Sequence, residues 1–163
     1  MTESITRILV AVDFSAHSDR ALRYAARLAG QVGASVELLH VVEDISYGAF
    51  SEVYVPNMPD LLQDMVNNGV QRLTSLKAAL FPSRADVETT VFVGRPASAI
   101  VDHARAGAFD LIVMGTHGRT GLSHMFTGSV AERVVRTAPC AVLTVRGADA
   151  PAAASPAGPA KAA

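Results

Sequence analysis

The residues of this chain best suited to chemistry are glycines that follow a short apolar run. Residues 111–114 are apolar, and the pattern Gly-x2-Gly-x9-Gly-Ser follows, at Gly115, Gly118, Gly128 and Ser129. Glycine leaves backbone N–H groups uncovered and tolerates positive φ, so a glycine-rich loop after a strand can wrap a phosphate. A helical pattern begins at Ser129, and a helix N-terminus adds unpaired donors and a positive dipole end. The pattern therefore predicts an anion-binding loop.

The same glycines have a simpler interpretation, as two ordinary turns. Ser129 would then only cap the helix that follows it, and Glu132 would complete a Ser-x-x-Glu capping box. A capped helix can still bind a phosphate, so the sequence leaves both interpretations open.

Composition and charge exclude several classes of protein. The chain has 163 residues, of which 50% are apolar and 18% charged, which suits one globular domain with a substantial core. A net charge of −1 and scattered arginines argue against a nucleic-acid surface. A single cysteine, Cys140, excludes an internal disulfide and fits a reducing compartment. We expect no signal peptide, because residues 1–4 are polar and lead directly into a predicted strand, and no apolar run approaches the roughly 18 residues of a membrane span. We therefore expect a cytoplasmic protein without membrane or nucleic-acid partners.

Strand and helix patterns alternate along the chain. Short apolar runs predict strands at residues 7–13, 35–42, 86–93, 110–115 and 140–146. Apolar residues at helical spacing predict helices at residues 15–33, 59–82, 96–107 and 129–137. Residues 43–58 have no clear period and are predicted to form a long loop. This alternation predicts an α/β fold, with a five-stranded parallel open sheet and helices on both faces.

The end of the chain differs in composition from the rest. Residues 147–163 are nearly all Ala, Pro and Gly, without an aromatic residue. Such a segment cannot bury enough apolar surface to offset its ordering entropy. We therefore predict a folded domain at residues 1–146 and a disordered tail at residues 147–163.

Two of the predicted strands end in residues that could hold a ligand. The first ends at Asp13 and the fourth at Gly115. In an open parallel sheet, ligands bind beyond the carboxyl ends of the strands, where the strand order reverses. If these strands are neighbours there, the Asp13 carboxylate can hold ribose hydroxyls or a cation while the glycine loop holds phosphates. That arrangement predicts a nucleotide site, although Asp13 could instead only cap the following turn.

Other kinds of site are excluded by missing residues. A Walker loop requires Gly-Lys-Ser/Thr, but the only lysines, Lys77 and Lys161, do not follow glycine. A dinucleotide fingerprint requires three glycines after the first strand, and residues 12–17 contain none. The chain also has no Cys/His cluster with zinc spacing.

Three segments together resemble the ATP-binding branch of the universal stress protein family. They are Ile8-Leu-Val-Ala-Val-Asp-Phe-Ser15, Val93-Gly-Arg-Pro96, and Met114-Gly-Thr-His-Gly118 with Gly128-Ser129. The resemblance covers about residues 5–146. It implies a Rossmann-like sandwich of the kind seen in adenine-nucleotide alpha hydrolases, with strand order 3-2-1-4-5. It also implies a homodimer, with ATP held between the first and fourth strands.

The resemblance implies roles for residues around the first two strands. Asp13 would contact ribose or Mg²⁺, and Val12 and Val41 would line the adenine pocket. Ala11 belongs to the same site, at a position where some ATP-binding members have proline, which puts the adenine-side backbone in question.

It implies further roles for residues after the fourth strand. Met114 and Gly115 would lie beneath the ribose. His117 and Arg119 lie inside the loop and could add positive charge near the phosphates, or could lie at a solvated loop tip. Backbone N–H groups and a hydroxyl would bind the phosphates, from Gly118, Gly128, Ser129 and Val130.

The remaining candidate residues are given structural roles. His40 lies on a predicted strand and is expected to be packed or hydrogen-bonded. His17, His103 and His124 are expected on the surface. Cys140 precedes a strand and is expected to be a small buried apolar residue.

Fast phosphoryl transfer requires a metal clamp, a positioned base and a cation on the transferred group. Asp13 and Arg119 could serve in part, but the sequence offers no convincing base. We therefore expect an ATP-binding regulatory or stress-response protein with at most slow hydrolysis and an unidentified signalling partner. A nucleotide-independent dimeric interaction module and a phosphotransferase remain alternatives.

The last predicted strand, residues 140–146, is also expected to form the dimer contact. In the order 3-2-1-4-5 it lies at a sheet edge, and its apolar residues 141–145 include no proline or lysine. Such an edge favours pairing with a second copy about a twofold axis. The alternative is an edge covered by the tail.

Overall fold

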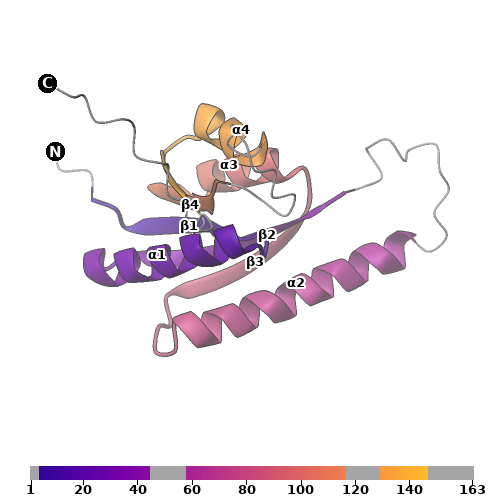
Figure 1. Cartoon of the computed structure of the whole chain (residues 1–163), viewed down its shortest axis with the longest axis horizontal. Coiled ribbons are helices and arrows are strands. Elements are labelled where there is room, and N and C mark those ends of the chain that lie inside the picture. Colours follow the sequence, from indigo (N-terminus) through magenta and orange to yellow (C-terminus); the bar gives the residue numbers. More distant parts are fainter. Residues whose placement is uncertain (1–3, 45–57, 117–128, 147–163) are drawn as a thin grey trace, which may run out of the picture.

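One parallel sheet organises the molecule, which is described here by a computed structural model covering residues 4–44, 58–116 and 129–146. Every paired neighbour in the sheet is parallel, and the order is β3-β2-β1-β4-β5, as Figure 1 shows. The strands are β1 (Arg7–Ala11), β2 (Ser35–Glu43), β3 (Val87–Gly94), β4 (Leu111–Gly115) and β5 (Ala141–Val145). The fold class and the strand order expected from the sequence are therefore confirmed.

Helices cover both faces of this sheet. Figure 1 shows α1 and α2 on one side and α3 and α4 on the other. The helices are α1 (Ala16–Val32), α2 (Met58–Leu80), α3 (Pro96–Ala106) and α4 (Ser129–Thr137). Element boundaries agree with the predicted ones to within two residues. Most of the predicted 43–58 loop and all of the predicted 147–163 tail lie outside the described residues.

The central strand β1 contributes to two separate cores. Its Ile8 and Val10 pack with α1 and α2, whereas Leu9 and Ala11 pack with α3 and α4. Ile8, Leu9 and Val10 have no exposed surface. A strand buried on both faces is continuously apolar rather than alternating, which is the pattern that its sequence shows.

The helix α1 begins and ends on clear capping signals. Ser15 is its N-cap and accepts a hydrogen bond from the Ser18 N–H at 3.2 Å. Gly33 ends it at φ 73°, a left-handed conformation in which its N–H donates to the Ala29 carbonyl at 2.9 Å. These caps place the start of α1 directly after the carboxyl end of β1.

His103 was expected on the surface, but its side chain is only partly exposed, because its ring contacts a buried carboxylate. Its Nε2 lies 2.7 Å from Glu37 Oε1, which also accepts a hydrogen bond from Thr90 Oγ1 at 2.6 Å. Glu37 is only 7% exposed, so its carboxylate needs these partners. The last turn of α3 packs over β2 and supplies one of them. Helical spacing alone did not reveal this buried acceptor.

No helix within the described residues is long and apolar enough to cross a membrane.

Asp110 joins the amino-terminal ends of β1 and β4. Its Oδ2 accepts hydrogen bonds from Thr6 Oγ1 at 2.7 Å, the Thr6 N–H at 2.8 Å and the Arg7 N–H at 2.9 Å. These bonds, led by the one from the Thr6 hydroxyl, hold the pKa of Asp110 below its usual value. The carboxylate therefore stabilises the amino-terminal ends of β1 and β4, at the opposite end of the strands from their carboxyl ends.

We predict that Asp110→Ala lowers the melting temperature by about 2–4 °C near neutral pH, for a loss of about 1 kcal/mol at this partly exposed site. Because the folded-state pKa is lowered, the stabilisation is present above the unfolded pKa of about 3.9 and is lost as pH falls through the folded pKa. Thermal unfolding across pH should show the two proteins converging in acid. Asp102→Ala, at an exposed ion pair with Arg105, is the control. A difference that persists undiminished at pH 2 contradicts this account.

Candidate functional site

A cavity of about 690 Å³ lies at the carboxyl ends of the central strands. It is bounded by residues following β1, by the end of β2, by the end of β4 and by the facing sides of α2, α3 and α4. This is where the strand order reverses, since β1 pairs with β2 on one side and with β4 on the other. Ala11 is paired with Met114 across that last contact. The predicted crevice between the first and fourth strands is therefore present.

Residues singled out from the sequence meet in this cavity. Those that line it are Ala11, Val12, Asp13, Val41, Met114, Gly115, Ser129 and Val130. The other predicted site residues, His117, Gly118, Arg119 and Gly128, lie outside the described residues. The structure thus brings together the base and ribose parts of the predicted site with the first residues of α4.

The turn between β1 and α1 shapes one side of the cavity. β1 ends at Ala11, earlier than predicted, but the Val12 N–H still donates to the Leu39 carbonyl at 2.8 Å. Asp13 Oδ1 then accepts a hydrogen bond from the Ser15 N–H at 2.9 Å. Asp13 therefore does cap the turn, as the alternative interpretation held, and its side chain lines the cavity as well.

Gly115 is required here by close packing. A Cβ built on Gly115 would lie 2.9 Å from both the backbone carbon and the Cβ of His17, and 3.1 Å from the Ser18 nitrogen. Real Cβ atoms do not approach backbone so closely. The glycine thus lets the first turn of α1 lie against the end of β4. Met114 before it is 5% exposed and packs into the core shared by α3 and α4.

His40 has the packed role that was expected, and it also lines the cavity. It is 7% exposed, and its Nδ1 lies 2.7 Å from the Val12 carbonyl oxygen. Since a carbonyl only accepts, Nδ1 carries a proton and donates. The His40 side chain, from β2, thereby holds the backbone at Val12 in place.

The sequence analysis did not predict that α2 forms a wall of the cavity. Asp64, Met65 and Asn68 of α2 line the cavity together with Phe14 and Ile100. Asp64 and Asn68 are exposed residues of an amphipathic helix, and in a sequence they cannot be told from an ordinary solvated face. Phe14 could have been predicted to line the site, because it lies between Asp13 and Ser15 in a segment that resembles the family.

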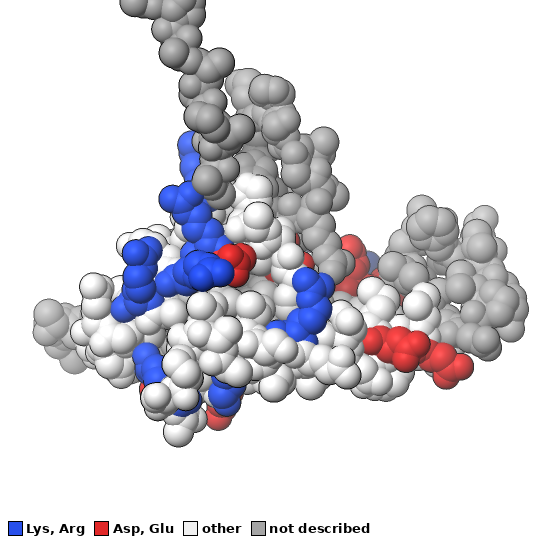
Figure 2. Space-filling view, turned by 60° about the horizontal axis from the view of Figure 1, so that its bottom comes forward, with Lys and Arg blue, Asp and Glu red and all other residues white. Residues whose placement is uncertain are grey.

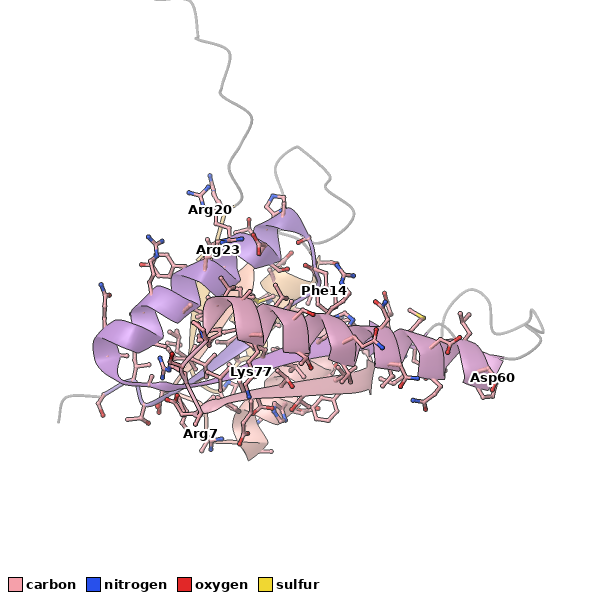
Figure 3. The ribbon with its side chains drawn as sticks, turned by 90° about the horizontal axis from the view of Figure 1, so that it is seen from below. Arg7, Phe14, Arg20, Arg23, Asp60 and Lys77 are labelled. Carbon is pink, nitrogen blue, oxygen red and sulfur yellow. The ribbon has the colours of Figure 1, made fainter. Side chains whose placement is uncertain are left out.

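The charged groups on the described lining are acidic. Asp13, Glu43 and Asp64 contribute carboxylates, and no Lys or Arg is among the lining residues that the structure describes. Figure 2 shows acidic side chains at the right-hand end of the face turned forward, and scattered basic side chains, with some acidic ones among them, over its left and middle. Asp60, labelled in Figure 3, marks the acidic end as the start of α2. A phosphate in this cavity therefore needs a cation or positive groups from elsewhere.

Neither metal-cluster nor thiol chemistry is indicated by the described residues. They contain no group of three or more His, Cys, Asp or Glu side chains placed to hold a metal ion. Cys140 is partly buried beside the core under α3 and α4, and burial raises the pKa of its thiol. A protonated, apolar-packed thiol fits the structural role expected for it.

The fold and the cavity define a class of protein, namely a doubly wound parallel α/β domain with its ligand crevice at the topological switch point. The model of the universal stress protein family matches residues 4–146. The chain belongs to the universal stress protein family.

Known proteins similar to this chain span its folded part. The universal stress protein YxiE of Bacillus subtilis is 33% identical over 145 residues, covering 86% of this chain and 98% of that protein. The structure of UspA from Lactobacillus plantarum is similar with a TM-score of 0.77 at 28% identity, covering 89% of this chain and 100% of that one. The universal stress protein of Archaeoglobus fulgidus in complex with dAMP has a TM-score of 0.60 at 25% identity, covering 87% and 98%.

We predict that Gly115→Ala lowers the free energy of unfolding by about 1–3 kcal/mol, because the added methyl must displace backbone of α1. The matched control is Gly30→Ala within α1, where a Cβ would meet nothing within 4 Å. That change should stabilise the protein by about 0.5 kcal/mol, through lower entropy of the unfolded chain. Urea unfolding of the two variants measures both effects. Equal stability of the two variants would show that the close approach at Gly115 carries no strain.

Proposed function

We propose that this protein binds an adenine nucleotide, with ATP as the principal ligand, in the cavity at the ends of β1 and β4. The observation that carries the proposal is the meeting of Asp13 and Gly115 at the switch point, beside apolar side chains suited to a flat base. A relative of the same fold binds dAMP, which supports an adenine ligand. The glycine pattern of residues 115–129 supports phosphate binding.

Different residues would contact the base, the ribose and the phosphates of the nucleotide. Val12 and Val41 contact the adenine, beside the backbone at Ala11, and Met114 and Gly115 lie under the ribose. The phosphates are bound at the start of α4 by Ser129 and Val130 and by the preceding loop residues, His117, Gly118, Arg119 and Gly128. The N-terminus of α4 adds its positive dipole end.

A magnesium ion fits the charge of this cavity. Three carboxylates on the described lining would repel a triphosphate, and a divalent cation on Asp13 would offset that repulsion. Asp13 uses Oδ1 for the turn, so the cation would be held through the rest of the carboxylate and the phosphate oxygens.

The role that follows is regulatory rather than catalytic. The described lining offers no Lys or Arg to hold a transferred phosphate, and the His40 proton at Nδ1 is committed to a backbone carbonyl. Arg119 of the loop could supply a cation, but the sequence offers no convincing base, so we expect phosphoryl transfer to be slow. We propose a nucleotide-binding stress-response protein with at most slow hydrolysis, acting through a partner yet to be identified. The family match ends at residue 146, which supports residues 1–146 as the functional unit.

The test of the nucleotide proposal is calorimetric titration with ATP, ADP and AMP, with and without Mg²⁺. We expect micromolar ATP affinity, equivalent to about 8 kcal/mol, with Mg²⁺ tightening it. Asp13→Asn keeps an acceptor for the Ser15 N–H but removes the charge, so it should abolish the tightening by Mg²⁺. Asp19→Asn, an exposed charge on α1, is the matched control. Gly128→Val should block the phosphates.

The outcome that refutes the nucleotide proposal is a folded wild-type protein that binds none of the three nucleotides. An equal response to Mg²⁺ in Asp13→Asn and Asp19→Asn would remove Asp13 from the metal site.

We further propose a homodimer through the strand at residues 140–146. β5 lies at the edge of the sheet, and its residues 142–145 are only half-buried within one chain. Val135 on the neighbouring α4 is 52% exposed. An apolar edge of this kind favours antiparallel pairing with a second copy.

The dimer proposal predicts that Val142→Lys shifts the protein towards monomer in light scattering at micromolar concentration, because it places a charge in the pairing strand. Val93→Lys, at an exposed apolar residue on the opposite edge strand β3, is the matched control and should leave the mass unchanged. A wild-type protein that is already monomeric at this concentration contradicts the proposal.

A further inference from the structure

The turn that carries Asp13 contains a backbone conformation that must be held in place. Phe14 has φ 63°, in the left-handed region that non-glycine residues rarely adopt. It lies between Asp13, which lines the cavity, and Ser15, which caps α1. Such residues persist only where the surrounding structure holds them, and they concentrate at functional sites. The contacts of Phe14 therefore bear on the shape of the site.

Two other elements contact the Phe14 ring. The His40 ring from β2 has its centroid 4.4 Å away and is tilted by 49°. The Arg72 guanidinium carbon from α2 lies 3.9 Å from the centre of the Phe14 ring, within cation–π range. Figure 3 shows Phe14 at the start of α1, beside α2. The ring thus joins the turn to β2 and α2 at once.

His40 is itself held from two directions. Its Nδ1 donates to the Val12 carbonyl at 2.7 Å, two residues before Phe14. On the other side, a Cβ built on Gly69 of α2 would lie only 3.0 Å from His40 Cδ2. The absence of a side chain at Gly69 therefore lets α2 sit directly against the imidazole. The imidazole is therefore packed between the Val12 carbonyl and the backbone of α2.

We infer that His40 and Arg72 are positioning residues for ligand binding. They hold the residue 12–15 turn in the form in which Val12 and Asp13 line the cavity, His40 through the Val12 carbonyl and Arg72 through the Phe14 ring. The ligand itself rests on the proposed function. If the turn leaves this form part of the time, only the remaining fraction of the protein can bind the ligand. The apparent dissociation constant is then the intrinsic one divided by that fraction.

The test uses paired variants of the full-length protein. Arg72→Met removes the cation and keeps the length, whereas Arg72→Lys keeps a cation. His40→Leu removes the donor, whereas His40→Asn keeps an N–H close to the place of Nδ1. Lys77→Met changes a cation further along α2 and serves as the control.

The readouts are ATP affinity by calorimetry and hydrogen exchange at the Ser15 amide in protein without nucleotide. We expect Arg72→Met to weaken ATP binding about two- to fivefold, the size of one exposed cation–π contact, and to speed exchange at Ser15. His40→Leu should weaken binding about tenfold. Arg72→Lys and His40→Asn should recover much of each loss, and Lys77→Met should match wild type.

The results separate this inference from the nucleotide proposal. If wild type binds ATP and the Arg72→Met protein binds equally with unchanged exchange, the positioning role is wrong. Equal losses in Arg72→Met and Arg72→Lys would overturn the role of the cation. A wild-type protein that binds no nucleotide refutes the proposed function, and exchange at Ser15 then decides the turn contacts alone. If His40→Leu does not fold, the two variants at the exposed Arg72, Arg72→Met and Arg72→Lys, still test the inference.

Discussion

The parallel pairing of β1 with both β2 and β4 is the constraint on which the remaining structure depends. A strand paired on both edges and buried on both faces leaves no room for its connections except beyond its ends. Right-handed crossovers then send α1 to one face and α3 to the other. α1 follows the carboxyl end of β1 and α3 follows that of β3, and the cavity lies at the carboxyl ends of β1 and β4, where the strand order reverses.

The two ends of β1 have different tasks. At the amino-terminal end, Asp110 accepts hydrogen bonds from Thr6 and Arg7 and so links the start of β4 to the start of β1. At the carboxyl end, the backbone polar groups beyond the strand are met by side chains, as with His40 and Val12. Polar groups are thus used for stability at one end and kept close to the cavity at the other. A ligand at the second end need not disturb the hydrogen bonds at the first.

Electrostatics explain why a phosphate ligand would require additional charge in this cavity. Asp13, Glu43 and Asp64 face it, and the described lining offers only helix and backbone dipoles in compensation. A cation bound with the nucleotide would neutralise part of this field. Binding would then respond to the metal as well as to the nucleotide.

The sequence by itself determined the order of strands and helices, the burial of β1 and the glycine pattern at residues 115–129, because periodicity and glycine chemistry are local properties. The predicted strand ends indicated Asp13 and Gly115, and the resemblance to a family supplied the sheet order and the residues Val41 and Met114 of the site. The tertiary structure alone decided that His103 pairs with the buried Glu37 and that α2 forms a wall of the cavity. It also decided that Phe14 meets Arg72. The physical reason is that helical spacing shows which face is polar but does not show what that face meets. Contacts between residues far apart in the chain exist only once the helices are packed on the sheet.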